Sequence, residues 1–486
     1  MGLWVVSRRR FDIVKTKFLL ENAISRSIVR RALEEVDGKT RLEKIIENYG
    51  KDVPVLERIR DYPIYKVLDI VRRAFNRTPE EFGKELRNLT VKKILLNAVK
   101  SLEKYGVTTP QIFVAPLMIV WNFTYRCNLK CRHCYENAGV LRGEKPRELT
   151  KEEKFRALEN LAESHIPTLF FSGGEPLIHP DFWDLAHKAK EYGFYISIAT
   201  NGTLIDEEMA KKIKDLGVGY VAISLDAASP ELHDNFRGVK GMWERAVRGI
   251  QNLVKEGVTT CIAYTLTRVN KDELPKLLKL REELGAYKVL VYNFVPVGRG
   301  DIADDLSPLE REEAYRIMLK ELKNEHLTVA TTAPQFGRFC KQNGSKFVSI
   351  SHYGCARSEE LGAIVDVIGG CGAGRAYAVI QPDGRITPCV YMPQLTIGHI
   401  LESSFQQIWD ESPVLNMLRD RSDLKGHCGE CEYNAICGGC RARAYAYFGD
   451  LKAPDPGCIY NLKYYEEFME KFRTNHEISG GVKKLS

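Results

Sequence analysis

Residues 120–135 read VWNFTYRCNLKCRHCY, and they join the end of a β-rich run to three closely spaced cysteines. Cys127, Cys131 and Cys134 fall within eight residues, and no fourth cysteine follows nearby. A metal site closed by protein alone needs four ligands, whereas an iron–sulfur cube held by three thiolates keeps one iron open for another molecule. This spacing therefore predicts a reactive cluster directly after a strand.

Two other uses of the cysteine triplet stay open from spacing alone. His133 would complete a Cys3His zinc set, although it lies between Arg132 and Cys134, where its side chain is expected to point away from the shared centre. A disulfide framework needs pairing partners, which this run does not offer. We expect an iron–sulfur cluster and keep zinc as the alternative.

The composition is that of a soluble protein with two or three domains. The chain has 486 residues, of which 44% are hydrophobic and 28% charged, and this length exceeds one ordinary core. No apolar run has the length of a membrane span, and the basic residues of MGLWVVSRRR follow the apolar ones, opposite to a secretory signal. We therefore expect a cytoplasmic protein, whose 13 cysteines are metal ligands rather than disulfides.

From about residue 117, short β-rich runs alternate with amphipathic helical stretches. Such alternation builds a parallel sheet with helices on one side, and right-handed crossovers curl it toward a barrel. Six units fall short of the eight of a closed barrel, so we predict an α/β fold with a partial (β/α)6 barrel. The expected strands are 117–123, 168–172, 195–200, 220–226, 259–265 and 288–294, and the expected helices are 151–164, 181–192, 206–216, 243–256, 272–284 and 308–324.

Glycine-rich and polar motifs follow the predicted strands. Active sites of parallel-sheet enzymes lie in the loops after the strands, and the cysteine triplet follows the first one. Glycines there let backbone groups approach a ligand closely, although the same pairs also form ordinary turns. The motifs are SGGEP at 172–176, TNGT at 200–203 and SLD at 224–226.

With these motifs, the chain resembles the radical S-adenosylmethionine (SAM) superfamily. CNLKCRHC is similar to that family's CxxxCxxC motif and FSGGEP to its GGEP motif, and the resemblance covers roughly residues 115–325. It implies a 4Fe–4S cluster on Cys127, Cys131 and Cys134 that binds SAM, and a 5′-deoxyadenosyl radical that abstracts hydrogen from an unactivated carbon. The residues expected on this basis to contact SAM are Gly173, Gly174, Glu175, Asn201, Ser224 and Arg237.

The implied contacts differ in kind, and two have ordinary structural alternatives. The backbone of residues 173–175 is expected to contact the amino group of SAM, and Asn201 and Ser224 to hold its ribose or carboxylate. Arg237 is expected to pair with the carboxylate through two hydrogen bonds. The alternatives are a solvated arginine beside a helix for Arg237 and a turn residue for Asn201.

A second group of cysteines lies between residues 371 and 458. It resembles the SPASM extension of radical SAM enzymes, which houses one or two auxiliary iron–sulfur clusters, and we expect two 4Fe–4S clusters here. Seven cysteines are one short of two four-thiolate clusters. By resemblance, an outer cluster would use Cys428, Cys431, Cys437 and Cys458, and an inner one would use Cys371, Cys389 and Cys440.

The fourth ligand of the inner cluster has to come from upstream. Cys355 is the nearest cysteine and Cys340 the next, and we expect Cys355 to be the ligand. The alternatives are an open iron that contacts substrate, or Cys355 as a hydrogen-atom donor. A zinc knuckle is the alternative for the two CxxC pairs of residues 428–440.

About 108 residues precede the first predicted strand, and they carry the basic excess of the chain. Residues 1–110 contain 24 Lys or Arg and 15 Asp or Glu, whereas the whole chain has a net charge of +7. Apolar residues recur along 20–36 and again along 91–102, which predicts amphipathic helices. Basic amphipathic helices suit an interfacial membrane anchor, and the alternative is that they pack on the barrel. Interspersed acidic residues disfavour nucleic-acid binding.

Four parts are therefore expected along the chain. They are a basic helical domain over 1–108, a radical SAM partial barrel over 109–325, a bridging segment over 326–370 and a SPASM domain over 371–486. The run CGGCRARAYAYFGDLKAPDPGC, residues 437–458, together with residues 120–135, most resembles enzymes of haem and haem-d1 biosynthesis and related archaeal maturases. That resemblance narrows the family without naming the substrate.

Three substrate classes follow from these features. The basic extension favours a hydrophobic, membrane-derived substrate, such as an archaeal isoprenoid lipid joined by C–C bond formation, with peripheral contact to the cytoplasmic face of the membrane. Oxidative decarboxylation of a tetrapyrrole side chain is the second hypothesis, and peptide or protein maturation is the third. We expect an electron donor such as ferredoxin or flavodoxin. A non-catalytic zinc or cluster-binding module is the alternative from another class.

Overall fold

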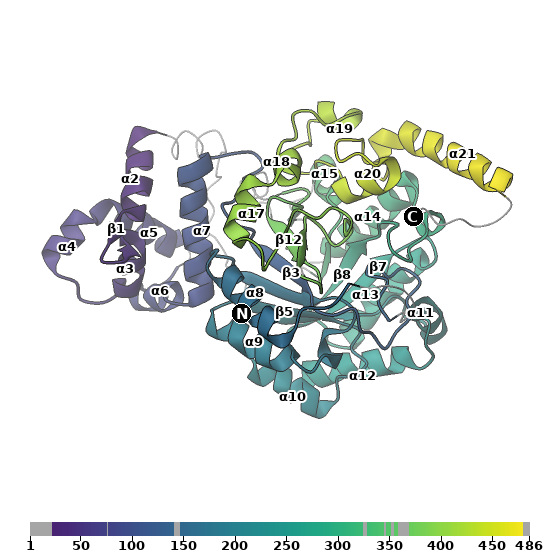
Figure 1. Cartoon of the computed structure of the whole chain (residues 1–486), viewed down its shortest axis with the longest axis horizontal. Coiled ribbons are helices and arrows are strands. Elements are labelled where there is room, and N and C mark those ends of the chain that lie inside the picture. Colours follow the sequence, from purple (N-terminus) through teal and green to yellow (C-terminus); the bar gives the residue numbers. More distant parts are fainter. Residues whose placement is uncertain are drawn as a thin grey trace.

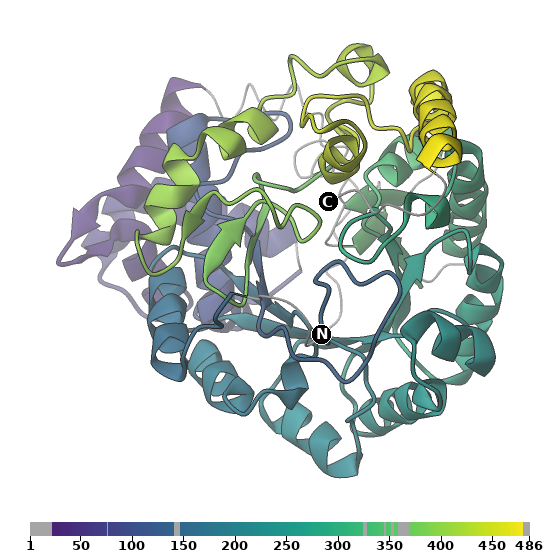
Figure 2. The same cartoon turned by 45° about the vertical axis from the view of Figure 1, so that its right-hand side comes forward.

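The structure, a computed structural model, describes residues 22–74, 76–139, 146–323, 328–344, 347–350, 354–357 and 369–479. Helices at the N-terminal end form a unit beside the rest of the molecule, and helices of the central region surround a large sheet (Figure 1). The C-terminal elements lie across the sheet's other side. Figure 2 shows the teal helices as an arc, with the green and yellow C-terminal elements between its ends.

The central sheet has ten strands, most of them paired in parallel. From β12 through β3 to β9, every neighbouring pair is parallel, while β13 and β14 extend the β12 edge in antiparallel fashion. The strands, in sheet order, are β14 Gly398–His399, β13 Arg385–Thr387, β12 Tyr377–Ile380, β3 Met118–Asn122, β4 Thr168–Ser172, β5 Tyr195–Thr200, β6 Tyr220–Ser224, β7 Thr260–Leu266, β8 Lys288–Asn293 and β9 Val329–Thr331.

The predicted partial barrel is confirmed, because all six predicted strands and all six predicted helices are present. The sheet is nevertheless longer than predicted. β9 adds a parallel strand after β8, and β12 pairs with β3 from far along the chain. The connecting helices are α8 Lys151–Ala162, α9 Phe182–Glu191, α10 Glu207–Asp215, α11 Pro230–Arg237, α12 Met242–Lys255, α13 Leu274–Glu283 and α14 Pro308–Leu322.

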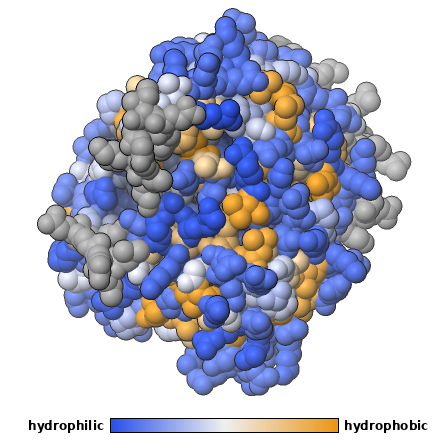
Figure 3. All heavy atoms as spheres, turned by 90° about the vertical axis from the view of Figure 1, so that its right-hand side faces the viewer, coloured by the Kyte–Doolittle hydropathy of each residue, from blue (hydrophilic) through white to orange (hydrophobic). Residues whose placement is uncertain are grey.

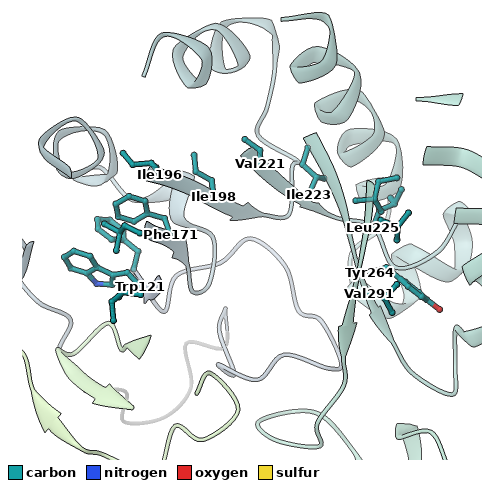
Figure 4. Close-up of a cluster of buried hydrophobic side chains, with 14 of the residues drawn as sticks. Trp121, Phe171, Ile196, Ile198, Val221, Ile223, Leu225, Tyr264 and Val291 are labelled. Carbon is teal, nitrogen blue, oxygen red and sulfur yellow. The ribbon is translucent and has the colours of Figure 1, made fainter. Parts of the chain in front are cut away.

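Alternate residues of each strand enter two different cores, because successive side chains of a strand point to opposite faces. The outer face packs against the helices, and Figure 4 shows part of this core, in which Trp121, Phe171 and Ile198 lie on three neighbouring strands. The inner face forms a second core, in which Phe170 and Ala222 join residues of the C-terminal region such as Met392. The barrel interior is thus closed by the C-terminal elements.

The N-terminal unit has a small core of its own. Four of its helices begin with side-chain caps, including capping boxes at Thr40 and Thr78. Its buried residues include Ile46 and Leu68, which come from different helices. The elements are α2 Ala23–Leu33, β1 Glu35–Val36, β2 Lys39–Thr40, α3 Arg41–Asn48, α4 Val55–Arg60, α5 Tyr62–Ala74, α6 Pro79–Leu86 and α7 Leu89–Tyr105.

The apolar stripes predicted in this unit are only partly buried. Ala32 faces the small core, whereas Ile24 is 74% exposed, and Leu20 lies outside the described residues. In α7 the buried positions are Leu96, Asn97 and Ser101, because this helix packs on the N-terminal core and on the barrel at once. The Asn97 amide donates a hydrogen bond to the carbonyl of Ala115, ahead of β3 (2.9 Å).

A buried charge network joins the C-terminal region to the barrel. Arg443 is fully buried and contacts Asp305 of the barrel and Asp455 of the C-terminal region at 3.4 Å each. It also donates to the carbonyl of Phe294 (2.9 Å). The remaining elements are α15 Gln335–Gln342, β10 Phe347–Ile350, β11 Gly354–Arg357, α17 Phe405–Glu411, α18 Pro413–Arg419, α19 His427–Glu430, α20 Arg441–Phe448 and α21 Leu462–Ser479.

The exposed surface is mostly polar on the side shown in Figure 3, where hydrophobic residues gather near the middle. Within the described residues, none of the helices combines the length and the apolar character that a membrane crossing requires.

We expect Arg443→Met to lower the free energy of unfolding by about 3 kcal/mol, because two buried carboxylates would lose a cationic partner. Urea titration of the purified protein measures this change. Lys463→Met is the control, since this side chain is 82% exposed on α21, and its effect should stay within about 0.5 kcal/mol. Equal effects of the two substitutions would contradict the role given to Arg443.

Candidate functional site

The three cysteines of the first cluster lie in a loop that follows β3. Cys131 is buried and Cys127 and Cys134 are half-buried, and they pack with Leu129 and Met242. Burial raises the pKa of the Cys127 thiol to about 12. Such thiols become thiolates only when a strongly electrophilic group binds them. The site therefore suits a metal cluster and offers little as a free nucleophile.

Backbone hydrogen bonds from segments that follow three other strands, including the end of α11, hold this cysteine loop. After β4, the amides of Gly174 and Glu175 donate to the carbonyls of Thr124 (2.7 Å) and Arg126 (2.9 Å). After β6 and β8, the contacts are Lys130 N–H to Arg237 O, Arg132 N–H to Phe236 O, and Arg299 N–H to Cys134 O, at 3.0 to 3.1 Å. The loop is therefore positioned by the carboxyl edge of the sheet.

The glycines of the GGE motif are needed for this close approach. A Cβ atom on Gly174 would lie 2.1 Å from the carbonyl oxygen of Arg126. Gly173 has a φ of +119°, and a Cβ there would lie 2.8 Å from the amide of Phe123. Any side chain at either position would push the cysteine loop away from β4.

Glu175 is fully buried and ties the loop after β4 to the loop after β5. One carboxylate oxygen accepts hydrogen bonds from the Leu177 amide (3.1 Å) and the Thr200 hydroxyl (2.9 Å), and the other accepts from the Asn201 amide (2.8 Å). Burial raises the pKa of Glu175 to about 7, although these hydrogen bonds and Arg237 oppose the shift.

Asn201 contacts the cysteine loop directly. Its side-chain amide donates to the Oδ1 of Asn128 (2.7 Å), and its own Oδ1 accepts from the amide of Thr203 (3.0 Å). The side chain thus does more than shape a turn, because Asn128 directly follows the first cysteine. Ser224 is half-buried at the end of β6, on the same edge of the sheet.

Arg237 lies beside the cysteine triplet and is not solvated. Its Nη1 approaches the sulfur of Cys131 at 3.5 Å, and its Nη2 pairs with Asp226 at 2.5 Å. Asp226 is fully buried and also accepts a hydrogen bond from the Thr265 amide (2.8 Å). Burial disfavours the charge of Arg237, but Asp226 and Cys131 outweigh it and raise the pKa above its ordinary value.

The four cysteines expected in an outer cluster line one cavity. Arg338, Asn434 and Asn461 line the same cavity. Within the part of the chain that the structure describes, no three His, Cys, Asp or Glu side chains meet as the ligands of one metal ion would. The cysteines concerned are Cys428, Cys431, Cys437 and Cys458.

The three cysteines expected in an inner cluster also lie together. Cys371, Cys389 and Cys440 belong to the core on the inner face of the barrel. Burial raises the pKa of the Cys389 thiol, and the nearby Cys371 and Cys440 raise it further. The amide of Cys371 donates to the carbonyl of Cys437 (3.0 Å), so one hydrogen bond joins the inner and outer sets.

Neither candidate for the fourth inner ligand is placed at this set. The backbone of Cys355 lies on β11, and its side chain is outside the described part of the structure. Cys340 is fully buried in the core on the helix side of the sheet, together with Phe336 and Phe339.

Two tyrosines connect the cysteine triplet with the inner cysteines. Tyr135 directly follows Cys134, and Tyr391 lies two residues after Cys389. Their rings meet edge to face with centroids 5.5 Å apart. Sequence patterns gave no sign of this contact, because the two residues are 256 positions apart.

Comparison with known proteins places the two cysteine regions in families. Residues 121–281 match the radical SAM superfamily, and residues 371–441 match SPASM, an iron–sulfur cluster-binding domain. The chain is 37% identical to an AdoMet-dependent heme synthase of Methanosarcina barkeri. The alignment extends over 352 residues, which are 71% of this chain and 97% of that protein. Pre-heme d1 synthase of Dinoroseobacter shibae is 32% identical, over 70% of this chain and 85% of that protein.

Among solved structures, SuiB of Streptococcus suis is similar in fold. It superposes with a TM-score of 0.61 at 19% identity, over 85% of this chain and 91% of SuiB. This likeness supports the architecture of barrel and cysteine-rich C-terminal region.

The buried carboxyl group of Glu175 gives stability a pH dependence. Its pKa of about 7 lies above the ordinary value of 4.5, so the protonated group favours folding at low pH. This contribution is lost as the pH rises through about 4.5 to about 7. We expect the free energy of unfolding of the cluster-free wild type to fall by up to about 3 kcal/mol over this pH range, relative to that of Glu175→Gln. Urea titrations at several pH values measure this difference.

The exposed Glu208 provides the matched control for this measurement, because its side chain is 78% exposed. Glu208→Gln should follow the pH profile of wild type. A Glu175→Gln profile that also runs parallel to wild type would show that Glu175 is ionised in the folded protein throughout this range.

Proposed function

The chain belongs to the radical SAM superfamily, and on this premise we propose that it decarboxylates a propionate side chain of a tetrapyrrole oxidatively. The observation that carries the proposal is the 37% identity to an AdoMet-dependent heme synthase along 97% of that protein's length. The match is too long to involve the barrel alone. It favours the tetrapyrrole hypothesis over the lipid hypothesis, which rested on the N-terminal charge.

The residues of the first site fit a 4Fe–4S cluster and SAM. Cys127, Cys131 and Cys134 would hold the cluster, and the cationic Arg237 beside Cys131 supports an anionic group there. When bound, the cluster and SAM supply a 5′-deoxyadenosyl radical, which takes one hydrogen atom from the substrate. Asp226 fixes the guanidinium of Arg237, so that its remaining donor atom Nε, which has no partner among the described residues, can meet the carboxylate of SAM.

The loop after β4 supports the amino group of SAM in this proposal. The amides of Gly174 and Glu175 already donate to the cysteine loop, so the carbonyl oxygens of this segment are the groups that an ammonium donor would meet. Asn201 and Ser224 lie on the same edge of the sheet and would hold ribose or carboxylate groups.

The apolar core that joins the two cysteine regions offers surfaces that suit a flat macrocycle. The inner face of the barrel carries Phe170, Tyr220 and Tyr292, and the C-terminal region adds Tyr391 and Cys389 to the same core. Aromatic rings offer large apolar faces for stacking. Apolar walls also exclude water, which protects a carbon radical from side reactions.

The proposed reaction needs an electron acceptor. A propionate side chain that loses a hydrogen atom from the carbon next to the ring becomes a vinyl group when it releases CO2 and one electron. The inner cysteines belong to the same apolar core, so an auxiliary cluster on Cys371, Cys389 and Cys440 would be close enough to take that electron. A second cluster on the outer cysteines would pass it onward.

Anaerobic incubation of the cluster-loaded protein with SAM, dithionite and iron coproporphyrin III tests the proposal. Mass spectrometry should show loss of CO2 and H2 per modified propionate. Tyr391→Leu should lower the turnover rate at least about tenfold, because the core beside the inner cysteines loses a rigid aromatic ring that would position the substrate. Tyr287→Leu is the control, since this tyrosine precedes β8 at the opposite edge of the sheet and is 42% exposed.

Two results would overturn the tetrapyrrole proposal. One is unchanged porphyrin in a preparation that cleaves SAM, and the other is equal turnover by the Tyr391 and Tyr287 variants. Modification of a peptide by the same preparation would instead favour peptide or protein maturation, the third substrate class expected from the sequence.

The lipid hypothesis keeps one specific observation in its favour. Helix α4 has no buried residue, and its apolar side chains Val55 and Leu56 are 72% and 82% exposed. Ile59 and, on α5, Ile70 are also more than half exposed. Exposed cations on the same two helices, among them Arg58, favour an anionic lipid surface as the partner.

Flotation with liposomes tests this second function. The protein should float with phosphatidylglycerol vesicles and stay behind with phosphatidylcholine vesicles, and Leu56→Glu with Ile59→Glu should reduce flotation at least about tenfold. Leu309→Glu is the matched control, because Leu309 is 60% exposed on the barrel. If wild type stays off anionic vesicles, the lipid function is refuted.

A further inference from the structure

Two arginines lie beside the outer cysteines without a carboxylate partner. Arg441 is 3% exposed, donates to the carbonyls of Leu451 (3.1 Å) and Ala453 (2.8 Å), and approaches the sulfur of Cys428 at 3.8 Å. Within the described residues, no Asp or Glu lies within ion-pair distance of its guanidinium. Its charge therefore faces a cysteine.

Arg421 lies between the outer and inner cysteines. Its Nη1 donates to the carbonyl of Asn434 (2.7 Å), and its Nη2 donates to the carbonyl of Cys371 (2.9 Å), a cysteine of the inner set. Gly438, next to Cys437 of the outer set, is so close that a Cβ there would lie 2.6 Å from the guanidinium carbon. Arg421 likewise has no carboxylate within ion-pair distance in the described chain.

A third arginine in this region does have a carboxylate partner. Arg338 lines the cavity of the outer cysteines, and it forms an ion pair with Glu312. A buried cation without a counter-charge is strongly unfavourable. Arg421 and Arg441 therefore favour an anionic group nearby, and the sulfurs of Cys428 beside Arg441 and of Cys371 and Cys437 near Arg421 can carry that charge when they bind a cluster.

We propose that Arg421 and Arg441 are positioning residues that compensate the charge of the outer cluster and make it easier to reduce. This inference rests on the proposed function, in which the substrate releases one electron. A 4Fe–4S core with four thiolates is anionic, and reduction adds a further negative charge. Two fixed cations stabilise the reduced form more than the oxidised form, which raises the reduction potential.

The positions of Arg421 and Arg441 favour electron transfer from the inner to the outer cluster. The hydrogen bond from the Cys371 amide to the Cys437 carbonyl joins a ligand of the inner cluster to a ligand of the outer cluster. If clusters are bound at both sets, Arg421 and Arg441 would make the outer one the better electron acceptor, so one electron would move from the inner to the outer cluster. A soluble one-electron carrier protein would then take up that electron.

Potentiometric titration of the cluster-loaded protein, followed by electron paramagnetic resonance, tests this proposal. Cys431→Ala, which removes an outer ligand, identifies the outer signal. Arg441→Gln should lower the midpoint potential of the outer cluster alone, and Arg421→Gln should lower the potentials of both auxiliary clusters. The Arg→Lys variants should restore most of each shift, because they keep the charge. Arg473→Gln, on the exposed side of α21, should change nothing.

Unchanged midpoint potentials in both Gln variants, at an iron content equal to wild type, would overturn the proposal. Equal shifts in the Lys and Gln variants would also overturn it, because they would show a structural effect that does not depend on charge. If Arg421→Gln loses iron, Arg441→Gln and the two Lys variants decide the question. The titration contains neither SAM nor tetrapyrrole, so its outcome is independent of the substrate assay.

Discussion

The hydrogen bonds between the cysteine loop and the carboxyl edge of the sheet are the contacts on which the site depends. The loop after β3 has no helix or strand of its own between Phe123 and Gly139. Its shape is imposed by backbone contacts from the segment after β4, from the last turn of α11 and from the segment after β8, and by the side chain of Asn201. Parallel strands bring these segments to one edge of the sheet, so the shape of the cluster site depends on the fold of the barrel.

The second half of the site is supplied from the distant part of the chain. β12 pairs with β3 in parallel, which brings the segment carrying Cys371 and Cys389 to the interior of the barrel. The buried pairs of Arg443 with Asp305 and Asp455 hold α20, and with it Cys440, against the barrel. The two cysteine regions therefore come from distant parts of the chain, and the contact of Tyr135 with Tyr391 connects them.

Regular, strongly patterned elements were predictable from the sequence, and elements defined by long-range pairing were not. The strands at 168–172 and 195–200 have the predicted bounds, because apolar β-rich runs end at clear turn residues. β9 and β12 are only three and four residues long and are stabilised by their neighbours, which leaves little local signal. The outer and inner cysteine sets were expected from the resemblance to SPASM domains, whereas the ion pair of Asp226 with Arg237 joins the segment after β6 to the last residue of α11.

Reductive cleavage of SAM by the cluster-loaded protein tests the central claim most directly. Under anaerobic conditions with dithionite, wild type should form 5′-deoxyadenosine, and so should Cys431→Ala, which changes only the outer site. The triple variant Cys127→Ala, Cys131→Ala and Cys134→Ala should form none, although it keeps the auxiliary cysteines. Continued cleavage by the triple variant, or no cleavage by wild type with its full iron content, would contradict the assignment of the cysteine loop as the reactive centre.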